Sequence, residues 1–581
     1  MTMITTSREA ESFVSEVAAG HTKTFDFETK GLDPYADDTG IIGLAGRVDG
    51  GRSVYLPFNH PETANLPWEV LDDVWLAALK KGRMRNHNLP FDTHMAKEKR
   101  GLPYPPKQQD SMVAMQLENE NRLGPGGAMK GAFALKPWCE LTFGPDAVMA
   151  ETELRRRMLE KGLDPKADMW RVPGHEVAGY ACGDVELVDR AYDEYLDARL
   201  EKLGITALAE DFYDYRRLLT RMEGDGMHLE TDLVEAFRIE CIREKSSKER
   251  ILRKMADNPE LNLNSPVQMM KLLEMGSTEK VRLERAARTN PGAAHLASFR
   301  RWDYARSHFY EPLQRFAHGG ILHPQFRTIR TGRLSMFEPN LHSTPHHRPE
   351  YRVKEVFTAP EGHFLVQADW DQAEMRLGAH YTQDPVLMDC FNTGGDIHGI
   401  VQADLASTGI TRQGAKALNF GVAYGKGARA IAWDLEISEA KAREWLMAYH
   451  ARYVGPKNLY QRMQHLAELK GWIRMWDGRY RRFDKTKNFY RTASNSLLQG
   501  GVGGMARVAM LRLEPYIYGV LEGTMWLQIH DSIIFCLPLK YDRPGTYETI
   551  RSMMEDFNFR VKMTVTIKKG PSWHGLEEVA A

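Results

Sequence analysis

The spacing of apolar residues predicts strands in some parts of the chain and long helices in others. Short apolar runs at 364–369 and 526–535 are typical of buried strands, and 24–28 has the composition of a further strand. Strands and helices alternate over residues 20–200, which predicts an α/β region. Three long amphipathic patterns then predict helices, at about 206–222, 230–257 and 292–317.

Two of the predicted strand regions carry an acid where the apolar pattern stops. Asp369 follows the run 364–368, and Asp531 lies between two apolar runs, as in a hairpin of two strands. A buried acid is costly unless it holds a cation, and Mg²⁺ usually takes one or two carboxylates plus substrate phosphates. We therefore predict a metal site at these two aspartates. The alternative is two ordinary strand ends with surface acids.

Four further acids are spread over the α/β region. Asp26 and Glu28 project from the same face of a strand because side chains alternate along it. Asp92 follows Asn88 at a probable helix start, and Tyr180 lies four residues before the fourth acid, Asp184, hence beside it on a helix. Acids aimed at one point predict a second metal site, although four separated acids also arise by chance.

The helix expected from Arg412 carries a mixed stripe of side chains. Arg412, Lys416, Phe420 and Tyr424 recur every four residues and so lie on one slowly drifting face. Two cations followed by two aromatic rings suit a triphosphate at one end and a sugar and base at the other, whereas a core stripe would be apolar. A polar set repeats every four residues further on, namely Arg491, Asn495 and Gln499.

Composition limits the class of protein without identifying it. The chain has 581 residues, 77 Lys and Arg against 78 Asp and Glu, and 43% hydrophobic residues, which is typical of a soluble globular protein with several domains. Basic clusters at 243–254 and 474–491 are candidate phosphate contacts. Five cysteines without a CxxC pair argue against zinc and disulfides, and the absence of an 18-residue apolar run or signal peptide predicts a cytoplasmic protein.

The acids of the first 200 residues resemble the three motifs of the proofreading 3′–5′ exonuclease domain of DNA polymerases, in the Tyr-containing subtype of the DEDD nucleases. The resemblance implies an RNase H-like α/β domain over residues 1–203. It implies that Asp26, Glu28, Asp92 and Asp184 bind two metals and that Tyr180 orients the attacking water. It places Leu32 as an apolar wedge against the terminal base.

The remainder resembles family A DNA polymerases, on three motifs: Asp369…Gln372…Glu374, the Arg412–Gly425 stripe, and Gln528-x-His530-Asp531. The implied fold is a multidomain α+β protein, in which the exonuclease domain precedes a right-hand polymerase domain over 204–581. Its expected parts are the thumb at about 204–320, the palm at about 321–395 and 490–581, and the fingers at about 396–489. No room remains for a 5′-nuclease domain.

By this resemblance Asp369 and Asp531 hold two Mg²⁺ or Mn²⁺ ions. Lys416 donates a proton to pyrophosphate, and Glu374, held by the hydroxyl of Tyr424, excludes ribonucleotides by crowding the 2′ position. The resemblance assigns the dNTP to Gln372, Glu374, His398, Arg412, Lys416, Phe420 and Tyr424. It assigns primer-template DNA to Arg333, Asn340, Arg491, Asn495, Gln499, His530 and, in the exonuclease domain, Leu32.

Two departures and several alternatives remain open. Ser532 stands where many relatives carry a second acid, and Trp370 replaces a usual Tyr. The resemblance suggests phage or bacterial DNA replication, with repair-type gap filling as the alternative, and a replisome helicase or primase cannot be read as a partner. A single-subunit RNA polymerase is disfavoured by Glu374 and the four acids. A stand-alone exonuclease is disfavoured by Asp369, Lys416 and Asp531.

Overall fold

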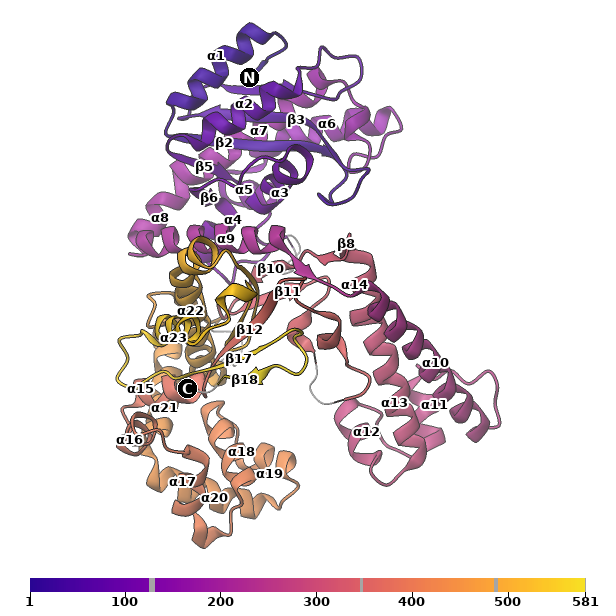
Figure 1. The fold of residues 1–581 in the computed structure, drawn as a ribbon, viewed down its shortest axis with the longest axis vertical. Coiled ribbons are helices and arrows are strands. Elements are labelled where there is room, and N and C mark those ends of the chain that lie inside the picture. The colour runs from indigo at the N-terminus through magenta and orange to yellow at the C-terminus, as the bar shows by residue number, and fades with distance from the viewer. Residues whose placement is uncertain (125–130, 345–347, 485–489, 580–581) are drawn as a thin grey trace.

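The computed structural model describes residues 1–124, 131–344, 348–484 and 490–579, and for residues 490 and 491 the backbone alone. Figure 1 shows four parts: an N-terminal body at the top, a central region built on a sheet, and two helical extensions. We call the extensions the arm, from α10 to α14 (residues 231–316), and the lobe, from α16 to α21 (residues 385–470).

The N-terminal body contains a six-stranded sheet in the order β1-β4-β3-β2-β5-β6. Neighbours β2–β3 and β3–β4 are antiparallel, whereas β1–β4, β2–β5 and β5–β6 are parallel. The strands are β1 (Thr2–Met3), β2 (Thr22–Lys30), β3 (Gly40–Val48), β4 (Ser53–Pro57), β5 (Arg83–Asn86) and β6 (Gln108–Asp110). The predicted alternation of strands and helices over this region is confirmed.

Side-chain alternation along the strands gives this sheet two buried faces. Leu44 of β3 packs in the same core as helices α1 and α2, whereas its neighbour Ala45 packs with α7 on the opposite face. The helices are α1 (Ser7–Ala19), α2 (Trp68–Leu79), α3 (Leu89–Arg100), α4 (Ser111–Glu118), α5 (Leu135–Phe143), α6 (Met149–Glu160), α7 (Gly174–Ala191) and α8 (Asp197–Lys202).

Long helices follow where the sequence predicts them. The linking helix α9 leads into the arm, where α10 packs along α13, and the third predicted helix is divided by a π-helical turn at Arg306–Tyr310. Ser265 caps α11 by accepting a bond from the backbone N–H of Gln268. The bounds are α9 (Thr206–Asp225), α10 (Thr231–Met255), α11 (Pro266–Leu273), α12 (Lys280–Ala286), α13 (Pro291–Ala305) and α14 (Glu311–Phe316).

The central sheet has five antiparallel strands in the order β15-β16-β12-β17-β18. Its apolar residues share one core with the base of the arm and with α22 and α23. The predicted buried strand and hairpin are present. The bounds are β12 (His363–Trp370), β15 (Thr524–Ile529), β16 (Ser532–Pro538), β17 (Val565–Gly570), β18 (Glu577–Glu578), α22 (Tyr490–Glu514) and α23 (Pro544–Glu555).

The lobe has a core of its own, separate from that of the sheet. Helix α15 joins the two, since Leu377 packs in the sheet core and Met375 in the lobe core. The helices are α15 (Ala373–Thr382), α16 (Pro385–Asn392), α17 (Ile397–Asp404), α18 (Arg412–Ala423), α19 (Ala428–Leu435), α20 (Glu439–Arg452) and α21 (Val454–Lys470).

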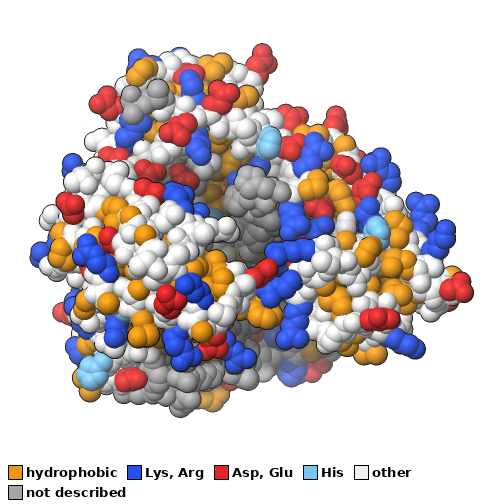
Figure 2. All heavy atoms as spheres, turned by 90° about the horizontal axis from the view of Figure 1, so that it is seen from below, with side chains coloured by type: hydrophobic (Ala, Val, Ile, Leu, Met, Phe, Trp, Pro, Cys, Tyr) orange, Lys and Arg blue, Asp and Glu red, His pale blue; other side chains and the backbone are white. Residues whose placement is uncertain are grey.

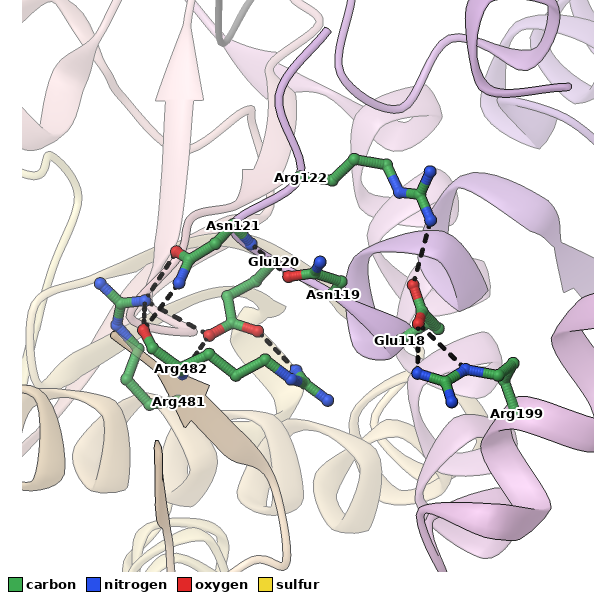
Figure 3. Close-up of polar contacts among 8 residues, drawn as sticks. All are labelled: Glu118, Asn119, Glu120, Asn121, Arg122, Arg199, Arg481 and Arg482. Atoms are coloured by element: carbon green, nitrogen blue, oxygen red, sulfur yellow. Dashed lines mark hydrogen bonds and ion pairs between the residues drawn. The ribbon is translucent and has the colours of Figure 1, made fainter. Parts of the chain in front are cut away.

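A buried polar joint fastens the N-terminal body to a hairpin of β13 (Trp472–Arg474) and β14 (Tyr480–Arg482) (Figure 3). Glu120 accepts from the backbone N–H of Arg482 at 2.5 Å and from its guanidinium at 2.7 Å, and pairs with Arg481 at 3.3 Å. Asn121 donates to the carbonyl of Arg482 at 2.7 Å. Because a buried carboxylate is costly without partners, these bonds stabilise the contact between the body and the hairpin.

Among the described residues no helix is long and apolar enough to cross a membrane. All five cysteines are buried free thiols.

Candidate active sites

The first site lies where strand β2 faces helix α7. Asp26 and Glu28 project from the same side of β2, and Asp184 comes from α7, so that one carboxylate oxygen of each lies within 4.8 Å of the others. The packing of α7 on β2 therefore brings together three of the four predicted acids.

The fourth acid, Asp92, is buried beside them and is held by the protein. One carboxylate oxygen accepts from the backbone N–H of Phe27 at 3.0 Å and the other from the side-chain amide of Asn86 at 3.1 Å. Asn88, the residue before α3, takes a left-handed conformation with φ 58°. Such strained positions cluster at functional sites, and here the turn delivers Asp92 to the end of β2.

Burial dominates the electrostatics of these acids. It raises the pKa of Glu28 to about 8 and that of Asp92 to about 7, and it raises the pKa of Asp26 well above its usual range, with the Asp92 charge as the next cause. Oxygen Oε1 of Glu28 is buried and has no hydrogen-bond partner. An orphaned carboxylate oxygen among all-oxygen donors fits a hard divalent cation such as Mg²⁺.

Lys136 supplies positive charge at this site, and the sequence analysis missed it. Its ammonium lies 2.9 Å from an oxygen of Asp184 and donates to the hydroxyl of Tyr180 at 2.8 Å. Lys136 stands in the first turn of α5, where a cation is disfavoured by the helix dipole. That misplaced cation is the one local signal that could have revealed it.

Leu32, the predicted apolar wedge, lies in the loop after β2 and is 80% exposed. A large apolar side chain held in solvent is available for contact with a ligand.

The second site lies at one end of the central sheet, where strand β12 ends and strands β15 and β16 are joined. Asp369, near the end of β12, pairs in register with Ser532 of β16, the residue after Asp531. The backbone N–H of Trp370 donates to the carbonyl of Asp531 at 2.9 Å. The predicted proximity of the two aspartates is thus present, and Ser532 turns its hydroxyl back to the carbonyl of Ile529 at 3.1 Å.

Burial is the main cause of a raised pKa at both aspartates. Burial followed by the charge of Asp531 raises the pKa of Asp369 to about 7, which Lys568 on β17 partly opposes, and burial raises the pKa of Asp531. Gln372, three residues after Asp369, and His530, directly before Asp531, both have a left-handed backbone with φ 54°. Two adjacent carboxylates disfavour joint ionisation unless a cation is added, so this donor set also fits Mg²⁺.

Glu374 closes one side of this site. Its carboxylate accepts from the hydroxyl of Tyr424 at 2.5 Å, as predicted, and it also accepts a bond from the guanidinium of Arg333. The turn that carries Arg333 lies against α22 because two glycines permit close approach. A Cβ at Gly500 would lie 2.5 Å from the carbonyl of Thr331.

The cations of the stripe on α18 are exposed, whereas its two rings are half-buried. Arg412 is paired with Asp396 at 2.9 Å, and Lys416 is exposed. The rings of Phe420 and Tyr424 are stacked with centroids 6.5 Å apart.

His398 is buried beside this stripe, in helix α17. The amide of Asn419 donates to its Nδ1 at 2.9 Å, and burial lowers the pKa of the imidazole. The ring is therefore neutral and carries its proton on Nε2.

The other predicted contacts are less closely tied to the acids. Asn340 caps a short helix by accepting from the backbone N–H of His342 at 3.1 Å, and His530 is exposed. Asn495 and Gln499 are half-buried on α22. The side chain of Arg491 lies outside the described residues.

Comparison with known proteins places these sites in a family context. The sequence model described as DNA polymerase family A matches residues 231–575. DNA polymerase I of Treponema pallidum (strain Nichols) is 27% identical over 467 residues, 74% of this chain and 46% of that protein. DNA polymerase I of Geobacillus stearothermophilus is 29% identical over 392 residues, 61% of this chain and 44% of that protein. The chain spans less than half the length of these relatives.

The fold of the whole chain has a counterpart among solved structures. It matches the POL domain of Pol1 from M. smegmatis, solved in complex with DNA primer-template and dNTP, with a TM-score of 0.80. The match covers 99% of both chains at 23% sequence identity. The mixed α and β architecture is therefore shared over essentially the whole chain.

Proposed function

Because the chain belongs to DNA polymerase family A, we propose that it extends a DNA primer on a template by adding deoxynucleotides from dNTPs. The observation that carries the proposal is the placement of Asp369 beside Asp531 at the strand ends of the central sheet, next to Glu374. The family match and the all-oxygen donor set support it.

In the proposed reaction Asp369 and Asp531 would hold divalent cations, which would supply positive charge to lower the pKa of the primer hydroxyl and to neutralise the triphosphate. Arg412, Lys416 and the Nε2–H of His398 bind phosphate oxygens. Lys416 protonates the leaving pyrophosphate, because an exposed ammonium is a mobile proton donor. Phe420 packs on the nucleotide, and Gln372 borders the same pocket.

Glu374 selects the sugar in this proposal. Its two bonds, from Tyr424 and from Arg333, fix the carboxylate at the side of the pocket. A 2′-hydroxyl would overlap with it and disturb both bonds. The duplex would then be contacted by Arg333, Asn340, Arg491, Asn495, Gln499 and His530.

We also propose a 3′–5′ exonuclease activity for the N-terminal body. It rests on Asp26, Glu28 and Asp184, whose oxygens lie within 4.8 Å of one another. Asp92 completes the acid set, Tyr180 orients the attacking water and Leu32 wedges the terminal base. Proofreading follows if both sites act on one primer end.

The proposed division places an RNase H-like exonuclease domain at 1–203, with the arm as part of the thumb and the lobe as part of the fingers. The central sheet is the palm. DNA replication in a phage or bacterial setting is the proposed role, and gap-filling repair is the alternative.

A primer-extension assay tests both activities. A labelled primer on a longer template should lengthen with Mg²⁺ and dNTPs, and a mismatched primer should shorten when dNTPs are withheld. Extension with rNTPs in place of dNTPs would indicate an RNA polymerase instead. Shortening without any extension would overturn the polymerase proposal, and extension without shortening would overturn the exonuclease proposal.

A further inference from the structure

Arg479 belongs to the basic cluster at 474–491, but its side chain is buried. Figure 2 shows Lys and Arg side chains along a hollow of the surface, where phosphates would reach them, whereas Arg479 is only 7% exposed. It stands directly before β14, and its guanidinium donates to the carbonyl of Thr331 at 2.9 Å and to that of Gly500 at 2.7 Å. An oxygen of Asp477 lies 3.7 Å from the same group. Because a buried charge is costly unless it is paired and hydrogen-bonded, these contacts stabilise Arg479 between three segments that are distant in the sequence.

The turn at residues 329–333 packs closely on this guanidinium. Two backbone bonds close the turn, from the N–H of Gly332 to the carbonyl of Ile329 at 2.7 Å and from the N–H of Ile329 to the carbonyl of Arg333 at 2.9 Å. Gly332 has φ 84°, and a Cβ there would overlap with a guanidinium nitrogen of Arg479. The position of the turn therefore depends on its contact with Arg479.

The same turn carries Arg333, which reaches Glu374. The carboxylate of Glu374 accepts bonds from Arg333 and from the hydroxyl of Tyr424, so it is held from two sides. If the turn shifted, the bond from Arg333 would be lost. The carboxylate would then be free to rotate about its remaining bond to Tyr424, and space would open for a 2′-hydroxyl.

The N-terminal body supports this arrangement from the other side. Glu120 pairs with two arginines of β14, as Figure 3 shows. Gln116 of α4 donates to the carbonyl of Thr328 at 2.6 Å, at the end of β10 (Gln325–Thr328). Because Thr328 directly precedes the turn, the body contacts both the hairpin and the turn that Arg479 joins.

We propose that Arg479 is a positioning residue for the choice of sugar: it holds the turn that brings Arg333 to Glu374, and so keeps the carboxylate where it excludes a 2′-hydroxyl. The inference rests on the proposed polymerase function and on the role of Glu374 in it. Arg479 acts through the backbone, since its bonds end on the carbonyl oxygens of Thr331 and Gly500. A lysine would carry the same charge but lacks the planar fork that spans two carbonyls.

Arg479→Lys tests the proposal in the full chain. Single-nucleotide extension with rNTP and dNTP in competition gives the ratio of the two kcat/KM values. The variant should raise the use of rNTP relative to dNTP by about threefold, the scale of one hydrogen bond. A general loss of stability would act on both nucleotides alike, so the ratio reports on the pocket. An unchanged ratio in the folded variant would overturn the proposal.

A double-mutant cycle with Glu374→Ala separates positioning from a general structural role. In the Glu374→Ala background, Arg479→Lys should leave the ratio unchanged, because the carboxylate that it positions is gone. The same threefold rise in that background would show that Arg479 acts on another part of the pocket, and would overturn the proposal.

Gly332→Ala is a second variant, which decides the question if circular dichroism shows that Arg479→Lys does not fold. Its Cβ displaces the turn from an intact Arg479. The ratio should rise by at least about threefold, the loss of the same hydrogen bond, and only when Glu374 is present. No rise in this variant would overturn the proposal.

Arg462→Lys is the matched control. It makes the same change at an exposed arginine of α21, whose guanidinium contacts the carbonyl of Tyr381 at 3.5 Å, and its ratio should equal that of wild type. An equal rise in this control would show a general effect of replacing arginine and would overturn the proposal. Absent extension with dNTP by the unmodified protein would instead overturn the polymerase proposal, before any ratio is measured.

Discussion

The two carboxylate sites differ in how the protein encloses them. Asp26, Glu28 and Asp184 lie between the first sheet and α7, inside one body, with Lys136 as a resident counter-charge. Asp369 and Asp531 lie at the strand ends of the central sheet, and both are half-buried. The first site is assembled within one body, whereas the second combines the central sheet with Glu374 of α15 and with Tyr424 at the end of the lobe helix α18.

This difference changes the free-energy cost of keeping the acids charged in each site. In the first, burial raises the pKa of every acid, and an oxygen of Glu28 is left without a partner, so the folded body carries an unfavourable charge cluster until a cation binds. In the second, burial also raises the pKa of both aspartates, but each is only half-buried and can meet cations that arrive with the substrate. Removing acids should therefore act mainly on stability and cleavage in one site and on synthesis in the other.

The largest effect is expected at the second site. Asp369→Ala or Asp531→Ala removes one of two carboxylates shared by the cations, and extension should fall by about 10³-fold or more, the scale of lost electrostatic stabilisation of a transition state. Single-nucleotide extension under enzyme excess measures it. Shortening of a mismatched primer should continue, and near-normal extension by either variant would contradict the assignment.

The complementary change acts on the first site. Asp26→Ala with Glu28→Ala should lower shortening of a mismatched primer by about 10²-fold or more, because two of the clustered acids are lost. Extension by the same preparation should stay within about twofold, since the sites lie in different bodies. Wild-type shortening by this variant would show that these acids are not the nuclease ligands.

Short-range spacing predicted the parts of both sites that lie on single elements. Asp26 and Glu28 follow from strand alternation, and Asp184 and Tyr180 from helical spacing. Contacts that join distant segments could not be predicted in this way. Lys136 reaches Tyr180 from another helix, and the bond between Arg333 and Glu374 depends on how the sheet and α22 pack.

The same limit applies to the joints between bodies. Strand and helix patterns fix which face of each element is apolar, but a polar residue such as Glu120 carries no pattern that identifies its partner. The joint at Glu120 is therefore a product of the tertiary arrangement (Figure 3). The family resemblance predicted the general fold, which the comparisons confirm, while the residue roles stay predictions.

A smaller effect is expected for sugar selection. Glu374→Ala should raise the use of rNTP relative to dNTP by about tenfold, equal to about 1.4 kcal/mol. The variant removes the carboxylate that both Tyr424 and Arg333 hold. Competition between the two nucleotides in single-nucleotide extension measures the ratio.

Tyr424→Phe is the matched control for this change, because it removes one bond to Glu374 and keeps the ring. It should give a smaller shift in the same direction. If Glu374→Ala discriminates against rNTP as well as wild type does, the side chain that excludes ribose lies elsewhere.

The smallest effect concerns stability and follows from the raised pKa of Glu28. Its pKa in the folded body is about 8, against about 4.5 for a solvent-exposed glutamate, because burial disfavours the charged form. Below pH 4.5 both states hold the proton. Between about pH 4.5 and 8 the unfolded chain loses it first, so rising pH destabilises the folded body.

Glu28→Gln cannot ionise, so with metal removed by EDTA its advantage in Tm over wild type should grow from pH 5 to pH 8. We expect a gain of about 2–4 °C at pH 8, the shift that about 1 kcal/mol causes in a body of this size. Calorimetry of the full chain at several pH values measures it.

Mg²⁺ should reduce the gap, because a bound cation stabilises the ionised carboxylate of wild type. Asp73→Asn, an exposed acid of α2, is the control and should show no such trend. Parallel Tm curves for wild type and Glu28→Gln would show that the buried charge of Glu28 does not destabilise the folded body. The enclosed first site would then carry no larger electrostatic cost than the half-buried second site.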